Sequence, residues 1–404
     1  MRILILGGDG YLGWPTAMYF SARGDDVAVI DNFAKRQWEL EEGIEPLQAI
    51  PSLHRRLRLW RSIGGREIGL FVGDLCNHRF VYKAIREFHP DAVIHYAEQP
   101  SAPYSMQSRS AAVYTQHNNI IGTLNVLFAM QSHCPDAHLV KLGTMGEYGT
   151  PNIDIEEGWI TIEHKGRRDT VLFPKRPGSF YHLSKVHDSA NLEFACRVWG
   201  FRCTDLNQGV VYGIETDETT LHSDLGTSFH YDDVFGTVLN RFIVQAAVGE
   251  PLTVYGAGGQ TRGFLNIRDT IRCVALAADN PPPPGEFRVF NQFTERFSVM
   301  DLAHRVEAAG RRAGLTVAID HLPNPRVEAE QHYYNAVHTK LPELGLKSHL
   351  LTDDVLDRML AVVRENAARV DKLVFRPRIT WKRGVDESAA ERQTIGVGRD
   401  GDTT

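Results

Sequence analysis

The sequence contains few cysteines and does not pair them at the spacings of a metal or redox motif. The five cysteines, Cys76, Cys134, Cys196, Cys203 and Cys273, are scattered and form no C-x-x-C pair. This pattern gives no support to a zinc site or a disulfide framework, and we expect reduced thiols and no bound metal.

Long hydrophobic runs and a large excess of charge are also lacking. The apolar runs are interrupted well before the roughly 20 residues that a membrane-spanning helix needs, and no basic, hydrophobic leader precedes the first expected strand at residue 2. The net charge of −6 over 404 residues argues against a general binder of polyanions. We therefore expect a cytoplasmic protein that binds neither nucleic acid nor membrane.

Short apolar runs alternate with helical patterns through the first 200 residues. Helical spacing is clearest over residues 11–23, 107–133 and 181–199. The expected strands cover residues 2–6, 26–30, 69–72, 92–95, 138–142 and 202–206. This alternation predicts an α/β fold, a Rossmann-type doubly wound parallel sheet.

A glycine-rich loop directly follows the first expected strand and opens the first helix. It has glycines at G-x-x-G-x-x-G spacing, a pattern that lets backbone N–H groups approach a pyrophosphate at a helix N-terminus. The residues expected to hold the dinucleotide here are Gly7, Gly10, Tyr11, Leu12 and Gly13.

An acidic residue, Asp31, ends the second expected strand, where a carboxylate can bind the adenosine ribose hydroxyls and repel a 2′-phosphate. NAD is therefore expected in preference to NADP, although Lys35 and Arg36 close by moderate that preference. Asn32, next to Asp31, and Asp74 and Leu75, after the third strand, are also expected to bind the cofactor.

Tyr181 and Lys185 lie four residues apart in a helical segment, so both side chains share one helix face. The ammonium can then lower the pKa of the phenol, and the tyrosinate can take a proton from a sugar hydroxyl while hydride leaves. Thr144, at the end of an expected strand, can hydrogen-bond the same substrate oxygen, and Asn118 is expected near the nicotinamide.

With the loop and Asp31, these residues resemble the extended short-chain dehydrogenases/reductases that modify nucleotide sugars, over roughly residues 1–380. Six longer strings are similar to the UDP-sulfoquinovose synthase family: residues 143–157, 180–188, 205–213, 254–263, 289–294 and 323–330. That family joins sulfite to UDP-glucose. The resemblance implies bound NAD that is recycled, a 4-keto-5-ene intermediate and a homodimer.

The resemblance also implies a set of substrate-binding residues, comprising Arg109, Thr144, Met145, Gln208, Thr261, Arg262, Arg326 and Glu328. It implies an NAD-binding domain over residues 1–206 and a smaller substrate lobe over residues 207–383, from which some segments return to the first domain. Residues 384–404 are polar and glycine-rich, and we expect a disordered tail. Pro100 stands where the family pattern has arginine.

The residues after Thr144 leave the acid for loss of the C6 hydroxyl open. The related 4,6-dehydratases carry an Asp-Glu pair where this chain has Met145 and Gly146. His182 and Glu147 are the two candidates. The alternative functions are a UDP-glucose 4-epimerase or a 4,6-dehydratase-like enzyme, and, in a different class, a silent dinucleotide-binding protein.

Overall fold

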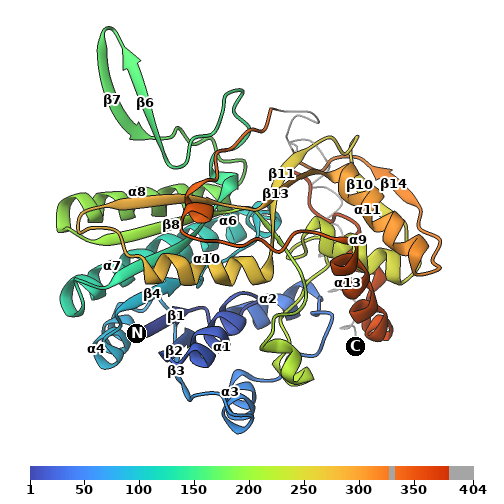
Figure 1. The fold of residues 1–404 in the computed structure, drawn as a ribbon, viewed down its shortest axis with the longest axis horizontal. Helices are drawn as coiled ribbons and strands as arrows, with labels where there is room; N and C mark the ends of the chain where they lie inside the picture. Colours follow the sequence, from blue (N-terminus) through green and yellow to red (C-terminus); the bar gives the residue numbers. More distant parts are fainter. Residues whose placement is uncertain (327–332, 382–404) are drawn as a thin grey trace, which may run out of the picture.

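The computed structural model describes residues 1–326 and 333–381. The proposed tail over residues 384–404 and Glu328 lie outside these ranges. A seven-stranded parallel sheet is flanked by helices on both faces, and a smaller lobe packs beside one end of it (Figure 1). The expected Rossmann-type fold is confirmed.

Every strand of the large sheet runs parallel to its neighbours. The spatial order is β12 (Phe287–Gln292), β8 (Arg202–Gln208), β5 (His138–Thr144), β4 (Ala92–His95), β1 (Arg2–Leu6), β2 (Asp26–Asp31) and β3 (Ile68–Val72). Because parallel strands end at one edge, the segments that follow β1, β4, β5 and β8 meet there.

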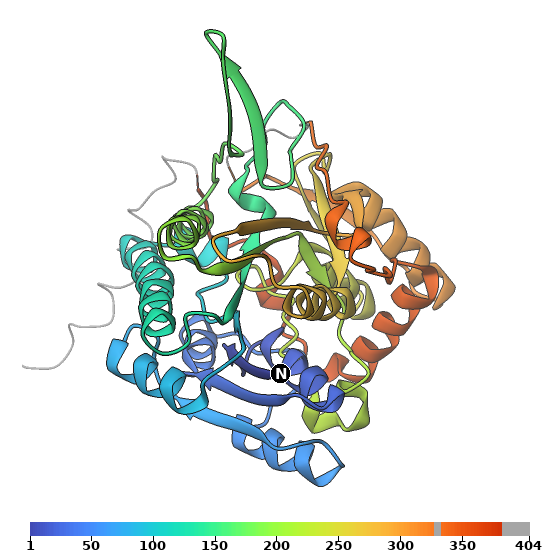
Figure 2. The same ribbon diagram turned by 60° about the vertical axis from the view of Figure 1, so that its left-hand side comes forward.

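Successive side chains of the buried strands point to opposite faces of the sheet. Ile3 and Ile5 pack against α1 (Gly13–Arg23), α3 (Leu53–Ser62) and α10 (Ile267–Asp279). Leu4 and Leu6 pack against α4 (His78–Phe88), α7 (Gly122–His133) and α8 (Phe180–Trp199). Figure 2 shows these two helical layers with the sheet between them. The period of two in β1 therefore builds two separate cores.

The helical pattern expected over residues 107–133 is interrupted. It consists of α6 (Arg109–Gln116), the π-helical turn η1 (His117–Ile121) and α7, and it is preceded by α5 (Ala102–Met106). Within η1 the buried Asn119 side chain accepts from the N–H of Gln99 at 2.8 Å and donates to Ser184 Oγ at 2.9 Å. The π turn thus places the Asn119 amide within hydrogen-bonding distance of two neighbouring segments. Such turns are frequent at functional sites.

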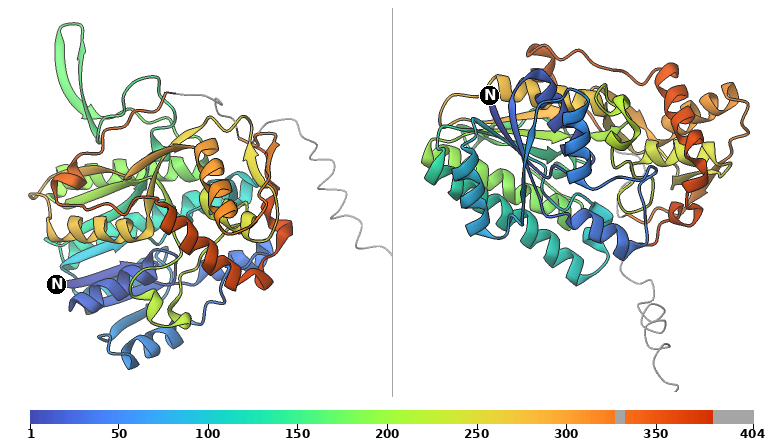
Figure 3. Two further views of the ribbon diagram at one scale, coloured as in Figure 1. Left: turned by 45° about the vertical axis from the view of Figure 1, so that its right-hand side comes forward. Right: turned by 90° about the horizontal axis from the view of Figure 1, so that it is seen from below.

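The smaller lobe is built around a core of its own, in which α9 (Val238–Ala247), α11 (Val299–Arg312) and α13 (Asp353–Glu365) pack together. Its strands form one pair and one triplet. These are β10 (Leu252–Tyr255) with β14 (Ile319–Leu322), and β13 (Glu295–Ser298), β11 (Thr261–Asn266) and β9 (Val210–Tyr212). Between them the chain returns to the large sheet as α10 and β12, visible on the left of Figure 3. The division after residue 206 stays a proposal.

A two-stranded hairpin, β6 (Trp159–His164) and β7 (Arg167–Leu172), projects from the body of the protein (Figure 1). Only its base is packed, where Trp159 and Leu172 contact the core. Sequence analysis did not predict this hairpin, and most of its residues are exposed.

The remaining helical segments are short or lie at the periphery. They are α2 (Ala34–Glu42), α12 (Lys340–Glu343) and the 3-10 turns η2 (Met145–Glu147), η3 (Thr219–Leu221), η4 (Ser223–Leu225), η5 (Ala367–Arg369) and η6 (Lys372–Phe375). Within residues 1–326 and 333–381, no helix has the length and apolar character to cross a membrane.

The core of the smaller lobe provides a test of this packing. Phe242 in α9 is fully buried there. We expect Phe242→Ala to lower the free energy of unfolding by about 3–5 kcal/mol, because it removes a large side chain and leaves a cavity. Urea denaturation measures the change. Leu221→Ala, at a side chain that is 61% exposed, is the control and should stay within about 0.5 kcal/mol. Equal effects of the two substitutions would contradict the packing.

Candidate active site

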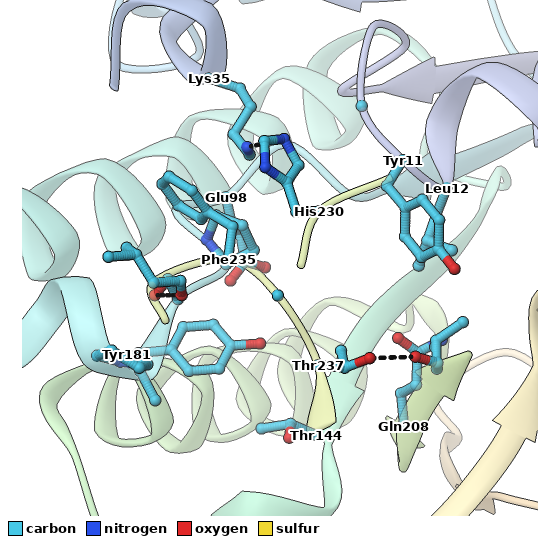
Figure 4. A pocket seen from close by; sticks show the side chains of 18 of the residues that line it. Tyr11, Leu12, Lys35, Glu98, Thr144, Tyr181, Gln208, His230, Phe235 and Thr237 are labelled. Carbon is cyan, nitrogen blue, oxygen red and sulfur yellow. Dashed lines mark hydrogen bonds between the residues drawn. The ribbon is translucent and has the colours of Figure 1, made fainter. Parts of the chain in front are cut away.

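A cavity of about 510 Å³ lies between the carboxyl ends of the sheet strands and the smaller lobe (Figure 4). Most of the residues expected to bind cofactor or substrate line it. They are Gly7, Gly10, Tyr11, Leu12, Gly13, Asp31, Asn32, Lys35, Asp74, Leu75, Asn118, Thr144, Tyr181, His182, Gln208, Arg262 and Arg326.

The glycine-rich loop has the backbone shape that a pyrophosphate requires. Gly7 has φ +88°, which L side chains rarely adopt, and a Cβ at Gly13 would lie 1.9 Å from the carbonyl oxygen of Gly7. The helix α1 that follows begins at Gly13, and its N-cap residue Leu12 makes no side-chain cap, so the first turn offers N–H groups to an anion. The loop therefore fits the phosphates of a dinucleotide.

Asp31 is held at the end of β2 by two backbone groups. Its carboxylate accepts hydrogen bonds from Asp9 N at 2.8 Å and from Phe33 N at 2.7 Å. Burial raises the pKa of Asp31 to about 6, against the effect of the two N–H groups. The side chain is therefore mainly ionised at neutral pH, and the remaining lone pairs of its oxygens can accept from ribose hydroxyls.

The two cations next to Asp31 are engaged within the protein. The Arg36 guanidinium pairs with Asp9 at 2.6 Å and also donates to two backbone carbonyls. Lys35 pairs with Glu39 at 2.9 Å and lies 2.9 Å from His230 Nε2. Neither side chain is thus directed to a 2′-phosphate. The geometry therefore favours NAD over NADP more strongly than the sequence does.

Tyr181 and Lys185 project from one face of α8, with Thr144 at the end of β5 below the Tyr181 ring in Figure 4. The Lys185 ammonium lies 5.7 Å from the centre of the Tyr181 ring. It donates to Leu142 O at 2.6 Å and forms an ion pair of 2.6 Å with Glu98. Burial raises the pKa of Tyr181 and the charge of Glu98 raises it further. The pKa of Tyr181 is therefore raised in the free protein, opposite to the lowering that the sequence predicts.

His182 lies directly over Gly146. A Cβ added at Gly146 would meet His182 Nε2 at 2.3 Å, so the imidazole fills the space that a side chain at position 146 would need. Burial, together with the charges of Arg326 and Arg262, lowers the pKa of His182 to about 3. The ring is therefore neutral at physiological pH, and its Nδ1 lies 3.1 Å from Ser179 Oγ.

Glu147 has a different environment from His182. Its carboxylate closes a capping box with Thr144 at the start of η2, pairs with Lys175 and lies 3.7 Å from Lys141 Nζ. Although burial raises its pKa, the charges of the two lysines bring it down to about 2. Glu147 is thus ionised, fully buried and absent from the cavity lining. Of the two candidate acids, the geometry favours His182.

Several other predicted residues lie away from the cavity lining. Arg109 is exposed at the start of α6, and Met145 packs in a small apolar cluster with Tyr148. Lys185 forms an ion pair with Glu98, and Arg36 forms an ion pair with Asp9. Thr261 is the first residue of β11. The structure gives no support to direct substrate contact by Arg109.

Sequence analysis missed a group of lining residues that includes Trp38, Glu98, His230, Phe235 and Trp381. Glu98 could have been predicted, because it follows β4 at the same edge of the sheet as the other site residues. His230 and Phe235 lie in an irregular polar stretch that carries no periodic signal. Among the described residues, no cluster of three potential ligands could hold a metal ion.

The fold and this site together define a dinucleotide-dependent enzyme of the short-chain dehydrogenase/reductase type. Residues 3–291 match the NAD dependent epimerase/dehydratase family. The chain belongs to that family, and NAD is its cofactor.

Two relatives are similar over nearly the whole chain. The chloroplastic UDP-sulfoquinovose synthase of Spinacia oleracea is 58% identical over 95% of this chain and 79% of its own length. The UDP-sulfoquinovose synthase of Sulfolobus acidocaldarius is 42% identical over 95% of this chain and 98% of its own. Among solved structures, a UDP-glucose 4-epimerase of Thermotoga maritima aligns with a TM-score of 0.68 at 20% identity, covering 90% of this chain and 99% of its own. This last likeness supports the fold.

The position of Asp31 predicts its effect on cofactor choice. Asp31→Asn retains an acceptor for the loop N–H groups but removes the charge that repels a 2′-phosphate. We expect the preference for NAD over NADP to fall by about tenfold or more, measured as a ratio of dissociation constants by calorimetry. Glu41→Gln removes an exposed charge from α2 and should leave the ratio unchanged. An unchanged ratio in Asp31→Asn would contradict the role.

Proposed function

We propose that this protein converts UDP-glucose and sulfite to UDP-sulfoquinovose and water. The observation that carries this proposal is the similarity to two UDP-sulfoquinovose synthases, 58% and 42% identical, over 95% of the chain. The cavity agrees with it, because Thr144 and Tyr181 line it together with the glycine-rich loop. A 4-epimerase is not favoured by the closer relatives.

The proposed reaction begins at sugar C4. Tyr181 takes the proton of the C4 hydroxyl, and Thr144 hydrogen-bonds the same oxygen. NAD, when bound, accepts the hydride from C4 and returns it at the end of the cycle. The C4 ketone acidifies the C5 proton, whose loss with the C6 hydroxyl gives a 4-keto-5-ene and water. Sulfite then adds at C6, C5 regains a proton and C4 is reduced.

His182 is proposed to donate a hydrogen bond to the departing C6 hydroxyl, and the proton lost from C5 completes the water. Its ring stands in the space that the missing side chain of Gly146 leaves open. A neutral imidazole can donate through the nitrogen that carries hydrogen, and the two arginine charges nearby lower its affinity for a further proton. Gly146 and His182 thus act as a pair in place of the acidic residues of the dehydratases.

The anionic parts of the substrates meet basic and amide groups in the cavity. Arg262 and Arg326 are proposed to bind the diphosphate, and Gln208 the sugar. Pro100 also lines the cavity, so the arginine of the family pattern is replaced at a position that faces the ligand. A homodimer and a cytoplasmic location are part of this proposal; the name of the spinach relative places that protein in the chloroplast.

Incubation of the enzyme with UDP-glucose, sulfite and NAD tests the proposal. We expect mass spectrometry to detect UDP-sulfoquinovose only when sulfite is added, and deuterium at C5 of the product when heavy water is the solvent. Tyr181→Phe should lower turnover by several orders of magnitude with little change in affinity for UDP-glucose. Formation of UDP-galactose with no sulfonate would establish the epimerase in its place.

The role of His182 predicts a separation of two rates. In His182→Ala we expect sulfonate formation to fall by about 100-fold or more, while exchange of the C5 proton falls less, because the exchange does not need loss of the C6 hydroxyl. Gly146→Ala should have a similar effect, since its Cβ displaces the ring. Gly178→Ala is the matched control, because a Cβ there meets nothing within 4 Å. Equal loss of both rates in His182→Ala would refute this role.

A further inference from the structure

Glu98 lies in the loop that follows β4, and hydrogen bonds of Asn119 tie this loop to the turn η1 and to α8. Asn119 in the π turn η1 accepts from Gln99 N at 2.8 Å and donates to Gln99 O at 3.3 Å. The same amide donates to Ser184 Oγ on α8 at 2.9 Å. The backbone beside Glu98 is therefore tied to the helix that carries Tyr181 and Lys185.

The Glu98 carboxylate is buried at the cavity wall. Its side chain is 2% exposed, and one oxygen lies 2.6 Å from Lys185 Nζ. Apart from this ion pair, neither oxygen accepts a hydrogen bond in the described part of the chain. Figure 4 shows Glu98 and Tyr181 on the same side of the cavity. A buried carboxylate is costly without a partner, so Glu98 depends on Lys185.

The Lys185 ammonium has three N–H groups. One donates to Leu142 O and a second faces Glu98, which leaves one for the cofactor or the tyrosine. The adjacent carboxylate has the opposite charge and opposes the effect of the ammonium on the phenol.

We propose that Glu98 is a positioning residue of this site: it orients the Lys185 ammonium and offsets its charge, so that Tyr181 retains the proton taken from the C4 hydroxyl while C5 and C6 react. The proton moves from the C4 oxygen to the Tyr181 oxygen and returns when the hydride does. Tight retention of the proton lengthens the ketone stage, during which water must leave and sulfite must add. The inference rests on the proposed function for these steps.

The charged groups around the pair come from several elements. Burial has the largest effect on the pKa of Tyr181 and raises it; Glu98 raises it next, Lys141 lowers it, and Glu147 raises it. His95, His182 and Asp188 also lie within the electrostatic reach of Lys185. Removing the charge of Glu98 removes the strongest charge that raises the pKa and leaves Lys185 without its counter-ion. Both changes lower the pKa of Tyr181.

Titration of the Tyr181 phenol tests the inference without substrate. Phenolate absorbance is followed with pH in wild type and Glu98→Gln, each with and without Tyr181→Phe, so that the difference isolates one of the 13 tyrosines. We expect the Tyr181 titration in Glu98→Gln to move at least one pH unit lower, about a tenfold change in its acid dissociation constant. The acid limb of the pH–activity profile of Glu98→Gln should also move to lower pH.

Three further variants separate charge from structure. Glu98→Asp keeps the charge and should titrate close to wild type, and Glu157→Gln removes another buried carboxylate, outside the cavity lining, and should leave Tyr181 unchanged. Lys185→Met leaves Glu98 unopposed and should move the titration higher, which keeps the test open if Glu98→Gln does not fold.

An unchanged Tyr181 titration in Glu98→Gln, equal shifts in Glu98→Asp and Glu98→Gln, or an unchanged titration in Lys185→Met would overturn the inference. Because no substrate is present, these outcomes are independent of whether a sulfonate is formed, so failure of the proposed function is seen separately in the product assay.

Discussion

The buried carboxylate of Glu147 joins the segments that carry the reactive groups. It accepts from the N–H of Thr144 at the end of β5 and from Ser189 Oγ on α8 at 3.0 Å, and it pairs with Lys175 in the chain that leads to α8. Lys141 lies three residues before Thr144 in β5. Its ammonium lies between the carboxylates of Glu147 and Asp205, at 3.7 Å from each. Such an internal charge network is stable only when its members remain paired. The relative placement of the threonine and the tyrosine therefore depends on a residue that does not reach the cavity.

A second constraint concerns space. The chain has room for either a side chain at position 146 or the imidazole of His182 above it, because the two would occupy the same volume. The loop after Thr144 thus leaves room for a histidine from α8, which lines the cavity at this point.

The sequence predicts the large sheet well because strand length, apolar runs and glycine position all follow from local patterns. Asp31, Thr144 and Tyr181 are predicted as site residues for the same reason, since each stands at a fixed place relative to a strand or helix, and all three line the cavity. The role of Glu147 is not predictable in this way: its neighbours Lys141, Lys175 and Ser189 come from three segments, and the balance of burial and charge at its carboxylate exists only after folding. The π turn around Asn119 is equally unpredictable from the sequence, because its residues continue a helical pattern without a break.

The return of the chain to the large sheet has a consequence for biosynthesis. The outermost strand, β12, pairs with β8 in register from Phe287 with Cys203 to Gln292 with Gln208, across a sequence separation of more than 80 residues. Contacts this distant in sequence are slow to form, and a growing chain folds from its N-terminus. On the ribosome the edge of β8 therefore stays unpaired until β9, α9, β10, β11 and α10 have been synthesised and β12 follows them.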